Sequence, residues 1–160
     1  MTYNTVKINI KNKEDYKNTY NENELSSELK EYILDHIKSK NTKQNIKLDI
    51  TTNFKINEKE ELNLRYMIRR AFGLDVSEIM NISKKRSLKS LFAFILGTIF
   101  LLIYSFIPNQ HVITEIILII GWVLIWESTY NFLFKNIETK LMIIRRKQII
   151  KSKIEINKES

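Results

Sequence analysis

The chain has 160 residues and no cysteine, which excludes disulfides, thiolate catalysis and cysteine-based zinc sites. Its net charge of +8 is uneven: residues 1–80 carry 14 cations against 13 acids, residues 81–90 carry four against none, and residues 135–160 carry eight against three. A nucleic-acid partner is therefore not expected, because its basic footprint would lie on the folded part of the chain.

Residues 1–87 are predicted to form a cytosolic α/β region. Alternating apolar residues predict strands over residues 2–10 and 46–54. Between them, residues 23–39 are predicted to form an amphipathic helix, because apolar residues recur there at every fourth position. The members of that stripe are Leu25, Leu29, Ile33 and Ile37.

A second helix is predicted to begin at residues 57–60. Asn57 and Glu60 have the spacing of a capping box, in which each residue bonds the backbone N–H of the other. The apolar stripe that follows consists of Leu64, Met67, Ile68, Ala71 and Phe72. Gly73 either ends this helix or is tolerated in it at a cost of about 1 kcal/mol relative to alanine.

Two long apolar segments come next, at residues 88–107 and 112–134, joined by a short turn at residues 108–111. A helix needs roughly 20 apolar residues to cross a bilayer core. The rest of the chain has too little apolar surface to bury two such helices inside a soluble protein. The segments are therefore predicted to form a transmembrane hairpin.

Cationic clusters flank the hairpin on its outer ends, whereas the turn carries no Lys or Arg. Cations beside membrane spans are retained on the cytoplasmic side. Both termini are therefore predicted to be cytoplasmic, in a plasma-membrane protein with an external turn. The flanking cations that are expected to contact an anionic inner leaflet are Lys84, Lys85, Arg86, Arg145, Arg146 and Lys147.

Residues 135–148 are predicted to form an amphipathic juxtamembrane helix. Its cations either bind the inner leaflet or only enforce the topology. Residues 149–156 alternate again, with Ile150, Ile154 and Ile156 on one face, and are predicted to return as a strand to the cytosolic sheet. A disordered tail is the alternative. The expected fold is an α/β unit of order β-α-β-α…β with an inserted transmembrane helical hairpin.

If the two helices of the hairpin are symmetric about a turn near residue 109, two residues at the same depth in the membrane have residue numbers that add up to about 218. Gly97 then faces Gly121, and Ala93 lies one turn from Gly97, so small residues allow close packing within the hairpin or between copies in a homo-oligomer. Glu127 lies in the second apolar segment, where an acid is costly. It is expected to pair with Lys89, to be hydrated near the inner interface, or to line a polar path.

No motif for catalysis is present: the chain lacks a phosphate-binding glycine loop, a His–Glu metal spacing and a nucleophile elbow. The two histidines, His36 and His111, lack a partner at ligand spacing. No catalytic, cofactor-binding or metal-binding residue is predicted, and the chain is not expected to be an enzyme.

The segments 120–127, 145–147 and 150–156 resemble those of small uncharacterised two-span membrane proteins of low-GC Gram-positive bacteria. The resemblance covers mainly the second half of the chain. It implies a cytoplasmic N-terminal region and a location in the plasma membrane, and it assigns no functional role to any residue.

These patterns predict a non-enzymatic, membrane-anchored interaction or scaffold module with an unidentified cytosolic protein partner. The alternative is an oligomeric membrane-perturbing or conducting protein built from the hairpin, with Glu127 in its polar path. The sequence identifies neither an activity nor a partner.

Overall fold

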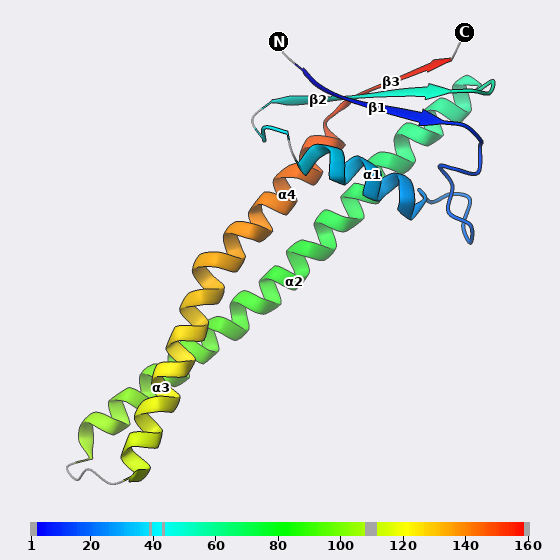
Figure 1. Ribbon diagram of the computed structural model, residues 1–160. Coiled ribbons are helices and arrows are strands. Elements are labelled where there is room, and N and C mark those ends of the chain that lie inside the picture. Colours follow the sequence, from blue (N-terminus) through cyan, green and yellow to red (C-terminus); the bar gives the residue numbers. More distant parts are fainter. Residues whose placement is uncertain (1–2, 39, 43, 108–111, 159–160) are drawn as a thin grey trace. The chain divides into compact units, whose positions relative to one another are not determined.

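The computed structural model describes residues 3–38, 40–42, 44–107 and 112–158. The chain divides into two compact units, an α/β unit (Met1–Glu78 with Met142–Ser160) and a helical unit (Ile79–Leu141). The elements, in chain order, are β1 (Tyr3–Ile10), α1 (Ser27–Lys38), β2 (Asn45–Thr52), α2 (Glu58–Phe106), α3 (Val112–Tyr130), a π-helical segment η1 (Asn131–Lys135), α4 (Asn136–Ile150) and β3 (Lys153–Lys158) (Figure 1).

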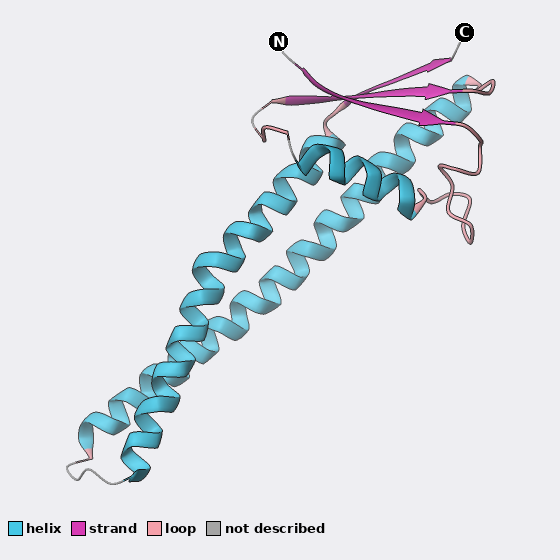
Figure 2. Cartoon of the chain, viewed as in Figure 1, coloured by secondary structure: helices cyan, strands magenta, loops and turns pink. Residues whose placement is uncertain are grey.

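The α/β unit is built on a parallel sheet of three strands in the order β1-β2-β3 (Figure 2). The predicted alternation is confirmed, because one face of each strand is buried. Val6, Leu48 and Ile154 form one row across the sheet, since Val6 pairs with Leu48 and Leu48 pairs with Ile154. The last strand of the chain thus completes a sheet begun before the apolar segments.

The boundary of that last strand differs from the prediction. Residues 149 and 150 end α4, and β3 begins at Lys153. Ser152, two residues after the helix, donates its hydroxyl to the Ile149 carbonyl oxygen at 2.7 Å. Ile149 is fully buried as a helical core residue, so Ile154 and Ile156 alone carry the alternation of β3.

Helix α1 begins four residues later than predicted, at Ser27. Ser26 supplies the N-cap, because its hydroxyl accepts the Leu29 N–H at 3.3 Å. Leu25 lies before the helix and is buried nevertheless. The rest of the predicted stripe, Leu29, Ile33 and Ile37, is buried in the core that also holds the first four turns of α2.

Helix α2 begins where the capping box predicts. The Asn57 N–H donates to Glu60 Oε2 at 3.0 Å, and the Glu60 N–H donates to Asn57 Oδ1 at 2.8 Å. Gly73 does not end the helix, which runs to Phe106. Leu64, Met67, Ile68 and Phe72 are fully buried against the core of the unit.

Replacing Asn57 with alanine is expected to lower the stability of the α/β unit by about 1 kcal/mol, because it removes the N-cap acceptor. Hydrogen exchange of the β2 amides in the detergent-solubilised full chain measures this loss. Asn63→Ala, at an exposed position inside the same helix, is the control and is expected not to accelerate exchange, because alanine favours the helix more than asparagine does. Equal effects of the two substitutions would contradict a capping role.

The helical unit contains the apolar parts of α2 and α3. Two helical segments, Glu58–Phe106 and Val112–Ile150, are long and apolar enough to cross a membrane, and only 11 % and 17 % of their most apolar windows are buried. The predicted turn at residues 108–111 lies outside the described residues. Helix α3 passes through η1 into α4, so the predicted border between span and juxtamembrane helix, at residues 134–135, falls inside a π-helix.

Candidate interaction surface

One carboxylate joins three helices of the α/β unit. Asp75 of α2 accepts Lys30 Nζ of α1 at 2.6 Å on one oxygen and Arg146 Nε of α4 at 3.2 Å on the other. The Asp75 and Arg146 side chains are only 15 % and 18 % exposed. The charges are therefore partly desolvated, and the three-helix junction fixes how α1, α2 and α4 meet.

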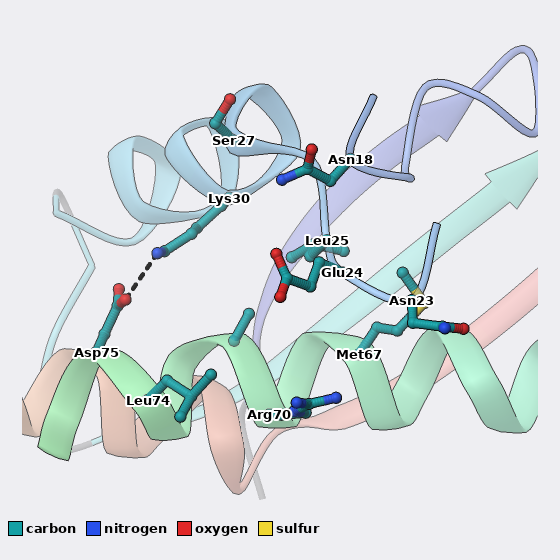
Figure 3. Close-up of a pocket in the computed structure, with 11 residues that line it drawn as sticks. Asn18, Asn23, Glu24, Leu25, Ser27, Lys30, Met67, Arg70, Leu74 and Asp75 are labelled. Atoms are coloured by element: carbon teal, nitrogen blue, oxygen red, sulfur yellow. Dashed lines mark hydrogen bonds and ion pairs between the residues drawn. The ribbon is translucent and has the colours of Figure 1, made fainter. Parts of the chain in front are cut away.

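A cleft of about 310 Å³ opens beside this junction, between α2 and the segment that leads into α1 (Figure 3). Figure 3 shows the Lys30 and Asp75 side chains pointing toward one another at one end, with Arg70 and Leu74 on α2. Asn18, Asn23 and Glu24, from the segment that leads into α1, also line the cleft. The cleft thus combines both signs of charge with the apolar side chains of Leu25 and Met67.

An exposed stripe on α2 continues from the cleft. Leu62, Tyr66, Arg70 and Leu74 are spaced four residues apart and so follow one side of the helix. The three apolar members keep 59–60 % of their surface exposed, and Arg70 forms no salt bridge within the part of the chain that the structure describes. Tyrosine and arginine are enriched at protein interfaces. We call the stripe and the adjoining cleft the α2 surface.

The carboxylate at the edge of the α2 surface is engaged by two cations. Asp75 accepts Lys30 Nζ on one oxygen and Arg146 Nε on the other, so this carboxylate connects the three helices of the junction. Among the described residues, no three His, Asp or Glu side chains gather into a group that could hold a metal ion. The expectation that the protein uses no cofactor stays a prediction.

The opposite face of the sheet is polar and is paired within itself. Glu155 accepts Lys47 Nζ at 2.6 Å and Lys153 Nζ at 2.8 Å, and Asn157 donates to Asp49 Oδ1 at 2.8 Å. The Lys153 bond lies within β3, whereas the bonds of Glu155 to Lys47 and of Asn157 to Asp49 cross from β3 to β2. These cross-strand bonds hold β3, which follows the helical unit in the chain, against β2, which precedes that unit.

Bonds from Lys153 first and Lys47 second lower the pKa of Glu155 from 4.5 to about 2. A lowered folded-state pKa contributes stability that is complete above the unfolded value of 4.5 and is lost as the pH falls through about 2. The free energy of unfolding of the wild type, relative to that of Glu155→Gln, is therefore expected to increase from pH 2 to pH 5 and then to level off.

An NMR titration of the Glu155 carboxyl carbon in the full chain checks this directly. The midpoint is expected near pH 2 in the wild type. Replacing both Lys47 and Lys153 with glutamine is expected to return it toward 4.5. A midpoint that both lysine substitutions leave unmoved would contradict the assignment.

The structure brings two of the predicted helix-packing residues together. A Cβ on Gly97 would lie 2.9 Å from the Gly121 carbonyl oxygen, and a Cβ on Gly121 would lie 3.2 Å from the Gly97 carbonyl oxygen. This contact agrees with the depth pairing and lies within one chain. Ala93 is half-buried on the same helix. Packing between copies stays a prediction.

Lys89 and Glu127 are both exposed, and no salt bridge joins them. The expected pair is thus not formed. Glu127 is placed off the buried side of α3, which carries Gly121 and Ser128. Its side chain therefore faces the surroundings of the hairpin.

The predicted lipid-contacting cations divide into two groups. Arg145 and Arg146 are used inside the α/β unit: Arg145 donates to the Lys38 carbonyl oxygen at 2.9 Å, and Arg146 binds Asp75. These two side chains have partners within the unit because α4 carries them into it, and their contact with lipid stays a prediction. Lys84, Lys85 and Lys147 are exposed, and Arg86 is half-buried.

Three residues that connect distant segments of the α/β unit could not be identified from the sequence. Lys30, Asp75 and Gln148 are ordinary polar residues of helices, and their partners lie 45 to 107 positions away. Gln148 Nε2 donates to the carbonyl oxygens of Asn41, Thr42 and Gln44, the shortest of the three bonds being 2.7 Å, and so ties the α1–β2 connection to α4. Long-range bonds of this kind leave no periodicity.

The chain matches no protein-family model, no curated protein and no solved structure. The resemblance of its second half to small two-span membrane proteins therefore stays a prediction.

Proposed function

We propose that the protein is a non-enzymatic, membrane-anchored interaction module. The hairpin of α2 and α3 crosses the plasma membrane twice, and the α/β unit presents the α2 surface to a cytosolic protein. The observation that carries the proposal is the exposure of the apolar windows of both helices, of which 11 % and 17 % is buried. Apolar surface on this scale requires a cover, and lipid supplies it.

The sheet supports the placement of both hairpin ends on one side of the membrane. β1 and β2 precede the hairpin, β3 follows it, and β3 pairs with β2 along its whole length. A strand cannot join a sheet across a bilayer, so both ends of the hairpin share one compartment. The cations at residues 84–89 identify that compartment as the cytoplasm by the positive-inside rule.

Labelling of introduced cysteines tests the topology, because the natural chain contains none. Gln110→Cys, outside the described residues, is expected to react with a membrane-impermeant maleimide on intact cells. Asn157→Cys is expected to react only after the cells are made permeable. Labelling of position 157 on intact cells would overturn the orientation, and recovery of the protein in the soluble fraction would overturn the anchor.

Site-specific photo-crosslinking tests the interaction role. A photoreactive residue in place of Tyr66 is expected to capture a protein in the membrane fraction, and Arg70→Glu is expected to reduce the yield by about tenfold or more, as at an interface hot spot. A photoreactive residue at Thr5, on the opposite face of the sheet, is the matched control. A yield at position 66 that does not respond to Arg70→Glu would argue against the α2 surface.

A second candidate function is membrane perturbation or conduction by an oligomer. The exposed Glu127 favours it, because an outward-facing acid on an apolar helix requires a polar partner or water. Dye leakage from liposomes containing the purified protein tests this function. Leakage that Glu127→Gln abolishes would replace the interaction module with a conducting oligomer, whereas intact liposomes would exclude conduction.

A further inference from the structure

The hairpin carries an apolar cavity of about 310 Å³ at the level of η1 that is open on one side. Its walls come from α2, α3 and η1, and they are formed by Ser90, Leu91, Phe94, Ser128, Thr129, Phe132 and Leu133. Ser90 and Ser128 are buried and small, so the facing helices leave room between them. The cavity belongs wholly to the helical unit.

The two α3 hydroxyl groups in the walls are bonded within their own helix. Ser128 Oγ donates to the Leu124 carbonyl oxygen at 2.7 Å, and Thr129 Oγ1 donates to the Ile125 carbonyl oxygen at 2.8 Å. Both hydrogens are therefore used inside α3. The cavity offers hydrocarbon-like walls to an occupant, and Phe132 and Leu133 at its rim are more than half exposed.

A cation lies one helical turn from this cavity. Arg86 precedes Ser90 by four residues and so lies on the same side of α2. It is half-buried, whereas its neighbours Lys84 and Lys85 are exposed. Within the described part of the chain, no salt bridge joins Arg86 to an acid. An unpaired guanidinium beside an apolar cavity is complementary to an anion that carries a hydrocarbon chain.

We infer that this cavity holds one acyl chain of an anionic phospholipid of the inner leaflet, with the lipid phosphate bound by Arg86. The inference rests on the proposed membrane anchoring and adds to it a specific lipid site. Arginine suits the role because its planar fork binds two phosphate oxygens at once. The occupant is a lipid of the surrounding leaflet because the rim residues Leu91, Phe132 and Leu133 are open to the membrane.

Quenching by brominated lipids tests the inference in nanodiscs that contain the full chain. Phe132→Trp on a Trp122→Phe, Trp126→Phe background places the sole tryptophan on the cavity wall. Brominated phosphatidylglycerol is expected to associate there about fivefold more strongly than brominated phosphatidylcholine, the factor that one nearby cation supplies. A chain that keeps only Trp122, which is exposed elsewhere on α3, is expected to show no such preference.

Two substitutions separate a built site from general surface attraction. Arg86→Gln is expected to abolish the preference at position 132, and Lys85→Gln, with the same loss of charge, is expected to preserve it. Ser90→Leu fills the cavity without changing the charge and is also expected to abolish the phosphatidylglycerol preference at position 132. Circular dichroism confirms that each variant remains folded.

The outcomes distinguish failure of the site from failure of the anchor. Equal quenching by both lipids would show ordinary boundary lipid, and so would an equal loss of the phosphatidylglycerol preference in Arg86→Gln and Lys85→Gln. Either result would overturn the lipid site and leave the membrane anchoring intact. An absence of quenching by either lipid at both tryptophan positions would overturn the membrane anchoring on which it rests.

Discussion

Replacing Asp75 with asparagine is expected to destabilise the α/β unit by about 2 kcal/mol. Loss of one partner of a buried ion pair costs about 3–5 kcal/mol, and partial exposure of this junction reduces that cost. The substitution leaves Arg146 and Lys30, which are 18 % and 31 % exposed, without their shared carboxylate. Exchange of the β2 amides in the full chain, measured in detergent, is expected to accelerate about 30-fold.

An exposed ion pair in the same unit provides the control. Asp35 binds Lys38 at 2.7 Å, but their side chains are 65 % and 64 % exposed. Asp35→Asn is expected to cost less than about 0.5 kcal/mol, because water screens exposed pairs. Equal losses for Asp75→Asn and Asp35→Asn would show that the junction is only a surface pair.

A double substitution distinguishes the loss of the ion-pair attraction from the cost of leaving a partly buried charge without a partner. Asp75→Leu with Arg146→Met removes both main charges and keeps apolar volume in their place. It is expected to recover most of the loss, because buried ion pairs are often replaced by apolar residues without a net cost. A double variant as unstable as Asp75→Asn would instead assign the cost to altered packing of α2 and α4.

Local patterns in the sequence predicted the elements of the α/β unit. Alternation located the strands, fourfold spacing located the buried face of α1, and the capping box located the start of α2 at Glu58. Each signal involves residues within a few positions of one another. The return of the last strand to the sheet was also expected from its alternation, whereas its pairing with β2 was not predicted.

The features that sequence reasoning missed depend on distant or ambiguous contacts. Tyr16 lies in the polar stretch between the predicted strand at residues 2–10 and the predicted helix at residues 23–39, yet it is buried, and its carbonyl oxygen accepts the Ser26 N–H at 2.9 Å. Ile149 belongs to a β-branched run that suits a strand as well as a helix. Arg146 resembled a lipid-binding cation because nothing near it in sequence indicates Asp75, 71 positions away. Helix η1 has no residue pattern that predicts it.

Replacing Gly97 with alanine is expected to destabilise the hairpin by about 1–3 kcal/mol, the usual cost of overpacking. The new Cβ would lie 2.9 Å from the Gly121 carbonyl oxygen and 3.1 Å from Leu124 Cβ, and both of these atoms move only with the backbone of α3. The two helices must therefore separate. Thermal unfolding in detergent, followed by the fluorescence of Trp122 and Trp126 on α3, measures the loss.

The other two glycines make the test specific to this contact. A Cβ on Gly121 would meet Leu101 Cδ2 at 2.9 Å, and this flexible side chain can turn away, so Gly121→Ala is expected to cost less than Gly97→Ala. No atom lies within 4 Å of a Cβ on Gly73, so Gly73→Ala is expected to stabilise α2 by up to about 1 kcal/mol. If Gly97→Ala unfolds at the wild-type temperature, the helices do not meet at this pair of glycines, because a methyl group has no space in the contact that the structure describes.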